Sequence, residues 1–276
     1  MNDHELAKYL AIEAGALLRE LRGDISPTPL GVQPSYDHEA LGKLGDRSAN
    51  DFLLNSLRNH RPDDVILSEE SLDPQLRHRA SRVWIIDPLD GTSSFSRGFP
   101  GFAVHVALWE RDSELPGSIT AAAISVPLFD LHLSTADSAE QVASGTSFIR
   151  SSDVIQPKFS EGTIRIVTSP SRPPKMLERV VDSLAKQFSQ DVEVQPLGSV
   201  GAKTAYIIAG AADIYLNTSG FHQWDIAAPI GVAAHYGLSS CLPTGRPHQM
   251  NGEGTEISGA LIARPQFVEP ILNSLA

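Results

Sequence analysis

The sequence lacks several features that would assign its class at once. It has a single cysteine, Cys241, so no disulfide can form within the chain, which is typical of proteins from a reducing compartment. No apolar run approaches the roughly 18 residues that a membrane-spanning helix needs. The N-terminus carries Asp3, His4 and Glu5 with no apolar segment behind them, so we identify no secretory signal. These absences predict a soluble, cytoplasmic protein with no membrane partner.

Two common catalytic signatures and an excess of basic residues are missing as well. No Gly-x4-Gly-Lys-Ser/Thr string occurs, which excludes a P-loop enzyme, and no Gly-x-Ser-x-Gly string indicates a serine hydrolase. The chain has 22 Lys and Arg against 33 Asp and Glu, for a net charge of −11. This charge argues against a nucleic acid polymer as partner. It also argues against an anionic small substrate, unless clustered carboxylates bind divalent cations locally.

The hydrophobic pattern divides the 276 residues into two halves of different character. In the first half it predicts helices over 3–22 and 46–60. A mostly antiparallel sheet should follow, with strands over 65–67, 83–86, 102–109, 119–126 and 131–134. Residues 144–162 are polar and poorly periodic, so we take them as the connection between the halves. The predicted units are therefore 1–155 and 156–276.

The second half alternates strands with helices. Its predicted strands are 163–168, 192–196, 213–216, 238–242 and 259–263. Its predicted helices are 173–188, 200–209, 225–236 and 265–275. Such alternation indicates a layered α/β half joined to the α+β half before it. In the first half, residues 23–43 are rich in proline, glycine and serine, and we predict a loop that is either a functional lid or a solvated linker.

One stretch combines a buried strand with polar chemistry. Residues 83–86 are apolar, and two carboxylates, Asp87 and Asp90, follow on either side of a proline. A carboxylate at a buried strand end needs a partner or a metal ion. Gly91 and Thr92 come next, where the backbone can turn and begin a helix whose free N–H groups suit a phosphate. The stretch therefore predicts a metal ion that faces a phosphate group.

Two other acidic positions are candidates on weaker grounds. Glu69 and Glu70 end the predicted strand 65–67, where a solvated turn is the simpler interpretation. Asp225 follows Trp224 and would also serve as the N-cap of the helix behind it. Mg²⁺ prefers octahedral oxygen ligands, and two or three such ions can activate a water against a phosphate ester. Together, the acidic positions are consistent with such a site.

Three motifs together resemble the inositol monophosphatase superfamily, a group of Mg²⁺-dependent, lithium-sensitive phosphatases. They are Asp-Pro-Leu-Asp-Gly-Thr at 87–92 with Phe95 behind it, Glu69-Glu70 upstream, and Trp-Asp-Ile-Ala-Ala at 224–228. They occur in the family's order, and the resemblance covers nearly the whole chain. It implies a layered αβαβα sandwich, the inositol monophosphatase-like (sugar phosphatase) fold. It also favours a homodimer.

Within the superfamily the sequence is most similar to the bacterial 3'(2'),5'-bisphosphate nucleotidases of the CysQ type. The similarity is carried by residues 45–50, 68–70, 171–174 and 198–203. Residues 94–100 instead lie nearer the inositol monophosphatase pattern. Pro229 also departs from the pattern, because it replaces the glycine that is common after the two alanines at 227 and 228. The resemblance therefore implies hydrolysis of adenosine 3',5'-bisphosphate to AMP and phosphate. It leaves an inositol, sugar or histidinol phosphate open as the alternative substrate.

The resemblance also implies metal ligands, all of which offer oxygen: Glu69, Asp87, Leu89 through its carbonyl, Asp90 and Asp225. Glu69, Asp87 and Leu89 would hold one Mg²⁺ ion. Asp87, Asp90 and Asp225 would hold a second, and Glu69 also lies near a third, weaker ion. A non-catalytic phosphate binder of the same fold would be favoured if a ligand were missing, but none is.

The remaining roles follow from the same matched positions. Asp46 and Thr92, with Glu69, form the implied catalytic set that activates the attacking water. The implied substrate contacts are backbone or side-chain groups of Gly91, Thr92, Ser93, Arg172, Ser199 and Lys203. Arg172 and Lys203 are candidates for a second phosphate, although a lone basic residue on an α/β surface is usually just solvated. His105 alternates with apolar neighbours in its strand, so we expect it to be structural.

Overall fold

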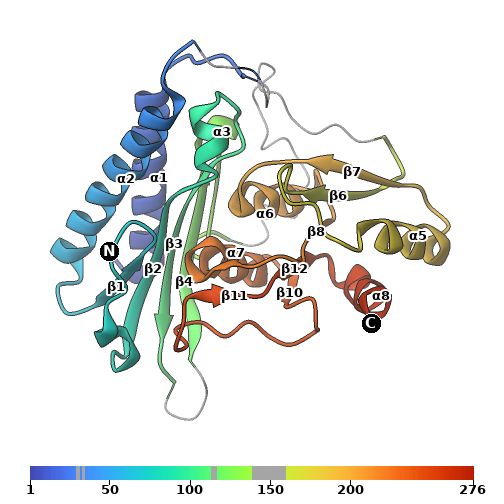
Figure 1. Cartoon of the computed structure of the whole chain (residues 1–276). Helices are drawn as coiled ribbons and strands as arrows, with labels where there is room; N and C mark the ends of the chain where they lie inside the picture. The colour runs from blue at the N-terminus through green and yellow to red at the C-terminus, as the bar shows by residue number, and fades with distance from the viewer. Residues whose placement is uncertain (29–31, 33–34, 113–116, 139–159) are drawn as a thin grey trace.

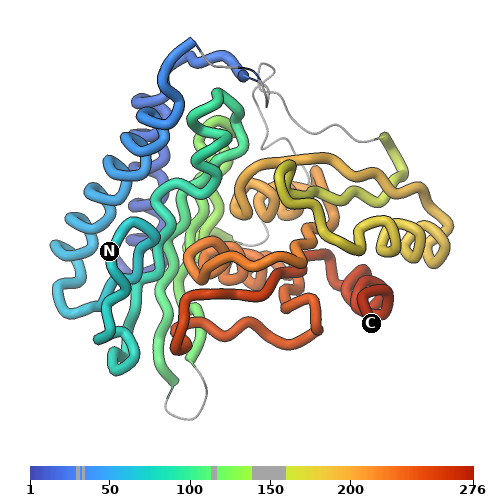
Figure 2. The backbone as a smooth tube through the Cα atoms, viewed as in Figure 1, coloured from blue at the N-terminus to red at the C-terminus, as the bar shows by residue number. Residues whose placement is uncertain are grey.

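Two β-sheets lie between three layers of helices (Figures 1 and 2). The computed structural model describes residues 1–28, 32, 35–112, 117–138 and 160–276. The order of layers is helices, sheet, helices, sheet, helices, which confirms the predicted αβαβα class. Among the described residues, no helix combines the length and apolar character that crossing a bilayer requires.

The first sheet has five strands that follow one another in chain order: β1 (Val65–Ser68), β2 (Arg82–Asp90), β3 (Ala103–Glu110), β4 (Ser118–Val126) and β5 (Leu131–Ser134). β1 and β2 are parallel, and the other neighbours are antiparallel. Short 3-10 helices, η1 (Gln75–His78) and η2 (Pro127–Phe129), connect β1 to β2 and β4 to β5. The predicted strands are confirmed, except that β2 continues through both carboxylates of the 87–90 motif.

The second sheet also has five strands: β6 (Ile164–Thr168), β7 (Val192–Pro196), β8 (Ile214–Asn217), β10 (Ser239–Cys241) and β12 (Ala260–Ala263). They lie in the order β10-β12-β8-β6-β7, with β6 parallel to β7 and β8. A separate two-stranded pair, β9 (Phe221–His222) with β11 (Glu256–Ile257), was not predicted. Strands of two residues are too short to show a period in the sequence.

Helices cover both sheets on both faces. The ranges are α1 (Asp3–Arg22), α2 (His38–His60), α3 (Thr92–Ser96), α5 (Leu177–Phe188), α6 (Val200–Ile208), α7 (Gln223–His235) and α8 (Pro265–Leu275). α1 and α2 pack on one face of the first sheet, and α6 and α7 lie between the sheets. α5 and α8 cover the outer face of the second sheet. The middle layer therefore touches both halves of the chain.

The side chains of β2 alternate between two cores, as the two-residue period of a strand requires. Trp84 and Ile86 belong to the core under α1 and α2, while Val83 and Ile85 belong to the core shared with α6 and α7. The residues of both cores are almost wholly buried. Continuing the alternation directs Asp87 towards the middle helices, which determines where the site forms.

Three sequence predictions need correction or fall outside the structure. α2 begins at His38, not at 46, because Asp37 caps it by accepting a hydrogen bond from the Ala40 amide at 2.9 Å. Gly45 lies within α2, where its missing Cβ lets the helix approach the Phe95 ring. The helix predicted over 173–188 begins at Leu177. The predicted boundary at 155 and most of the connection 144–162 lie outside the described residues.

The remaining loop, 23–37, is held against the end of α3 where it is described. Arg97 donates hydrogen bonds to the carbonyls of Thr28 and Val32, at 3.1 and 2.9 Å. The Tyr36 hydroxyl donates to the Ser96 carbonyl at 2.6 Å. Residues 29–31 and 33–34 lie outside the description. The lid and linker interpretations of this loop both stay predictions.

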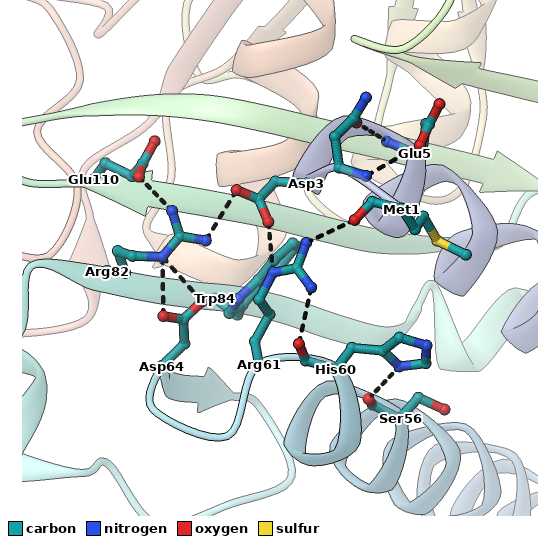
Figure 3. Close-up of polar contacts among 11 residues, drawn as sticks. Met1, Asp3, Glu5, Ser56, His60, Arg61, Asp64, Arg82, Trp84 and Glu110 are labelled. Carbon is teal, nitrogen blue, oxygen red and sulfur yellow. Dashed lines mark hydrogen bonds and ion pairs between the residues drawn. The ribbon is translucent and has the colours of Figure 1, made fainter.

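An ion network fixes the opposite end of β2 from the acidic motif (Figure 3). Arg82, the first residue of β2, bonds to Asp3 on α1, to Asp64 before β1 and to Glu110 at the end of β3, at 3.0, 2.9 and 2.5 Å. Arg61, after α2, donates to Asp3 at 2.7 Å. These contacts join α1, β2, β3 and the connection between α2 and β1, so the start of β2 is a fixed end.

Candidate active site

Carboxylates from distant parts of the sequence meet at the carboxyl end of β2. Asp87 and Asp90 belong to β2, and Asp225 lies in the first turn of α7. One carboxylate oxygen from each of the three lies within 4.8 Å of the others. Asp225 can reach the cluster because α7 packs on the same face of the first sheet that Asp87 faces.

A β-bulge places Asp87 and Asp90 on the same face of the sheet. Asp87 lies opposite His105 of β3 and Asp90 opposite Ala103, so β2 advances by three residues while β3 advances by two. Without the extra residue, strand alternation would turn Asp90 towards α1 and α2. Pro88 lies in the bulge, where its missing N–H costs no ladder hydrogen bond. The Asp-Pro-Leu-Asp spacing therefore has a structural cause.

Asp87 is more deeply buried than Asp90, its neighbour in the site. It is fully buried, and its Oδ1 accepts a hydrogen bond from the Leu89 amide at 3.0 Å. Its Oδ2 is buried without a hydrogen-bond donor among the described residues. Burial raises its pKa well above the usual value, and the charges of Glu69, Asp90 and Asp225 raise it further. A buried carboxylate oxygen of this kind fits a bound cation, and an all-oxygen donor set suits Mg²⁺.

The Asp90 carboxylate is held by the start of α6. Its Oδ2 accepts hydrogen bonds from the Ser199 hydroxyl at 2.6 Å, from the Gly201 amide at 3.1 Å and from the Val200 amide. Free N–H groups and the helix dipole both favour a carboxylate at this position. The contact joins the first sheet to the second half of the chain and fixes the orientation of Asp90.

Glu69 and Asp225 have strongly perturbed acidities. Glu69 is exposed as a residue, but protein atoms desolvate its carboxyl, and this burial, followed by the charge of Asp225, raises its pKa to about 7. Burial and then Asp90 raise the pKa of Asp225 to about 7. The N-cap of α7 is His222, whose amide donates to Asp225 at 2.6 Å, so the N-cap interpretation of Asp225 is wrong.

Asp46 and Thr92 are adjacent, as predicted. The Thr92 hydroxyl lies 3.3 Å from Asp46 Oδ1 and 3.2 Å from the Leu89 carbonyl oxygen. Burial and the charge of Glu70 raise the pKa of Asp46 to about 6. An acid of this kind next to a hydroxyl can accept a proton from it or from a water that it orients.

The turn between β2 and α3 depends on Gly91. Its φ of 90° lies in the left-handed region, and an added Cβ would lie 2.9 Å from the Gly101 carbonyl oxygen. Only glycine meets both conditions without strain. Thr92 and Ser93 then form the first turn of α3, whose leading N–H groups have no acceptor within the helix. The Thr92 hydroxyl contacts the Leu89 carbonyl oxygen, and this contact places the first turn of α3 beside the carboxylate cluster.

The three other predicted substrate contacts differ in accessibility. Arg172 is exposed, with Nη1 3.5 Å from the Gly220 carbonyl oxygen. Lys203 is only 2% exposed, and its Nζ donates to the Leu197 carbonyl at 3.0 Å. Burial lowers the pKa of Lys203 to about 8, although Asp90 and Asp225 oppose the shift. The Ser199 hydroxyl is engaged with Asp90. Their contacts with a substrate stay predictions.

His105 was predicted to be structural, and the structure places it directly behind the clustered acids. His105 is fully buried, its Nε2 lies 3.3 Å from Asp90 Oδ2, and its Nδ1 lies 3.3 Å from the Trp224 carbonyl oxygen. It therefore touches one predicted metal ligand and the residue before another. The signal available in the sequence was its position on the inward face of β3, which had been attributed to core packing alone.

The sequence matches known proteins along its whole length. Residues 4–269 match the inositol monophosphatase family. A protein of Mycobacterium bovis called 3'-phosphoadenosine 5'-phosphate phosphatase is 37% identical over 96% of this chain and 90% of its own. Its namesake in Mycobacterium leprae is 39% identical over 91% of this chain and 85% of its own.

The fold also matches solved structures. An inositol monophosphatase from Anabaena superposes with a TM-score of 0.67 over 99% of this chain and 94% of its own. One from Thermotoga maritima gives 0.66 over 100% and 97%. At 21% and 18% sequence identity, these two similarities establish the fold alone.

Proposed function

The chain belongs to the inositol monophosphatase family and is a phosphatase, and we propose that it is Mg²⁺-dependent and hydrolyses adenosine 3',5'-bisphosphate to AMP and phosphate. The observation that carries the metal dependence is the buried Asp87 Oδ2, which accepts no hydrogen bond from any residue that the structure describes, in a cluster with Asp90 and Asp225. The mycobacterial relatives, whose names specify this nucleotide, support the choice of substrate.

In this proposal the acidic residues hold two or three cations. Asp87, Asp90 and Asp225 form the central group, and Glu69 and the Leu89 carbonyl complete it. Bound Mg²⁺ supplies a Lewis acid that makes a water nucleophilic and offsets phosphate charge. Neutralisation by a cation would return the raised pKa values of these carboxyls towards the ionised state.

The other residues bind the substrate and move the proton. The N–H groups of Gly91, Thr92 and Ser93 bind the phosphate that is removed. The Thr92 hydroxyl orients the attacking water, and Asp46 accepts its proton. Water adds to phosphorus as the P–O bond to the ribose 3' oxygen breaks, and this oxygen takes up a proton, which yields AMP and inorganic phosphate. No covalent phosphoenzyme is needed.

The second phosphate and the ribose need their own contacts. Arg172 is exposed and so can meet an anionic group directly. Lys203 and Ser199 lie deeper, where they are 2% and 6% exposed, and would act on the substrate from within the start of α6. We also expect lithium to inhibit by competing for a cation position, and the protein to be a homodimer, on the strength of the family.

The test is phosphate release from adenosine 3',5'-bisphosphate and from inositol-1-phosphate, each with Mg²⁺ and with a chelator. The chelator should abolish activity, and kcat/KM should favour the bisphosphate. Removing a residue that only hydrogen-bonds to a metal ligand typically lowers activity about 10–100-fold. Asp87→Asn and Asp90→Asn should each lower activity by more than this, because they change the ligands themselves. Asp63→Asn, at an exposed position, is the matched control.

Two outcomes would contradict the proposal in separate ways. Near-normal turnover of folded Asp87→Asn in Mg²⁺ would remove the metal assignment. A kcat/KM ratio in favour of inositol-1-phosphate would keep the chemistry and replace the substrate, which residues 94–100 would then have indicated correctly.

A further inference from the structure

Arg77 of η1 is an arginine with no solvent exposure at all. Its Nε and Nη2 bond to the Asp73 carboxylate at 2.5 and 2.9 Å. Its Nη1 bonds to Asn251 Oδ1 at 3.0 Å and to the Gly252 carbonyl at 2.8 Å, and Nη2 also bonds to the Glu253 carbonyl at 3.3 Å. A buried guanidinium is costly unless its donors are paired, and here they are.

The contact is reciprocal and continues towards α7. Asn251 Nδ2 donates to the Arg77 carbonyl at 3.0 Å, and the Asn251 amide donates to Gln223 Oε1 at 2.6 Å. Gln223 Nε2 in turn donates to the Gly254 carbonyl at 2.6 Å. Gln223 is 1% exposed and begins α7, two residues before Asp225. The Arg77 contacts therefore end at the helix turn that carries one of the clustered acids.

The other end of this path is the segment that carries Glu69. Glu69 follows directly on β1, and the Ser71 amide bonds back to the Ser68 carbonyl at 3.3 Å. Asp73, two residues further on, is the carboxylate paired with Arg77. Arg77 thus ties the segment after β1, from the first half of the chain, to the loop under α7, from the second.

These two segments carry groups that repel each other. Glu69 lies four residues before Asp73, and Asp225 lies two residues after Gln223. A cation bound by both acids would offset the repulsion between their charges, but until it binds, other contacts must hold the two segments together. The Arg77 hydrogen bonds supply such contacts without touching either acid.

We propose that Arg77 is a positioning residue that holds Glu69 near Asp225 and so raises the affinity of the site for divalent cations. The inference rests on the proposed function, since it assumes that Glu69 and Asp225 bind the cations. It assigns Arg77 no contact with substrate. Its removal should weaken cation binding and leave the chemical step intact once cations are saturating.

The experiment measures Mg²⁺ binding without substrate, by calorimetry, together with the Mg²⁺ dependence of phosphate release. In Arg77→Met the Mg²⁺ dissociation constant should rise about ten-fold, as for other residues that orient metal ligands from outside. kcat at saturating Mg²⁺ should be unchanged. Arg79→Met is the matched control, because Arg79 lies two residues away and is exposed.

A second variant keeps the test decisive if Arg77→Met does not fold. Asn251→Gly removes the Asn251 bonds to Arg77 while suiting the positive φ of 57° at this position. Folded variants that keep wild-type Mg²⁺ affinity would overturn the inference, whether or not their kcat is reduced. If wild-type protein itself bound no Mg²⁺, the proposed function would fail and the inference with it.

Discussion

The Ser199 hydroxyl donates a 2.6 Å hydrogen bond to Asp90 Oδ2 and so connects the start of α6 to the end of β2. The Ser199 Oγ also accepts a hydrogen bond from the Ala202 amide at 3.0 Å, which makes Ser199 the N-cap of α6. Its φ of 59° lies in the left-handed region, which is costly for serine. One side chain thus caps a helix and orients a predicted metal ligand.

Ser199→Ala and Ser199→Gly should separate these two roles. Ser199→Ala should lower the free energy of unfolding by about 1–2 kcal/mol, because the cap is lost while the unfavourable φ is kept. Ser199→Gly should cost less, because glycine adopts that φ freely. Both should weaken Mg²⁺ to a similar degree, since both lose the bond to Asp90. Urea unfolding and Mg²⁺ titration of activity measure the two effects, and unchanged Mg²⁺ dependence in both would contradict the second role.

Substitutions of Thr92 and Asp46 should change kcat and leave the affinity for Mg²⁺ unchanged. Thr92→Ala and Asp46→Asn are expected to lower kcat by about 10²–10⁴-fold, the usual contribution of a positioned proton acceptor. Thr92→Ser keeps the hydroxyl 3.3 Å from Asp46 in reach and should retain most activity. Steady-state kinetics at saturating Mg²⁺ decide this, and an active Thr92→Ala would assign the water to another residue.

The stability of the metal-free protein should fall as the pH rises. Burial, with neighbouring carboxylates, raises the pKa of Asp46 to about 6 and those of Glu69 and Asp225 to about 7. Between about pH 4, where such groups titrate in the unfolded chain, and these values, the folded state binds more protons, so unfolding becomes easier with rising pH.

Mg²⁺ should cancel that loss, because it favours the ionised carboxylates. The difference in Tm between Mg²⁺ and chelator should therefore grow from about pH 5 to about pH 8. Asp225→Asn should flatten the pH dependence measured in chelator. Thermal unfolding followed by circular dichroism gives both curves, and a Mg²⁺ effect that shrinks with pH would contradict the assignment of these groups.

Arg172 should distinguish a substrate with two phosphates from one with a single phosphate. A charge-assisted hydrogen bond contributes about 1.5–3 kcal/mol, so Arg172→Gln should lower kcat/KM for adenosine 3',5'-bisphosphate about ten-fold or more. Turnover of inositol-1-phosphate should change little. Arg179→Gln, exposed on α5, controls for the loss of one surface charge. Equal effects of Arg172→Gln on both substrates would place Arg172 at the reacting phosphate or away from the site.

The fold was largely predictable from the sequence because apolar residues repeat with clear periods in every long element. β2 was predicted from its apolar run, Val83 to Ile86, but its continuation through the bulge was not. That continuation depends on pairing with β3, which no local pattern records. The early start of α2 was missed because its cap, Asp37, lies in a stretch rich in proline and glycine. Gly45 added to the error, since a glycine usually weakens a helix, whereas here it lets α2 pack against α3.

The candidate site was predictable where its residues lie in short motifs and hidden where they act across the fold. Asp87, Asp90 and Asp225 were expected from such motifs, and the structure brings them together. Arg77 and His105 gave no such signal, because Asn251 and Trp224, which they contact across the fold, lie 174 and 119 residues away in the sequence. Buried polar contacts of this kind become visible only when the layers are assembled.

The uncompensated Oδ2 of Asp87 has a consequence for anyone who engineers this protein. Burial and the neighbouring carboxylates oppose the ionisation of Asp87 in the metal-free fold, so a neutral replacement would raise heat resistance while it removes activity. A library selected for thermal survival in a chelating buffer would therefore enrich inactive proteins. Selection in Mg²⁺ would retain the acid, so the composition of the screening buffer decides which sequences survive.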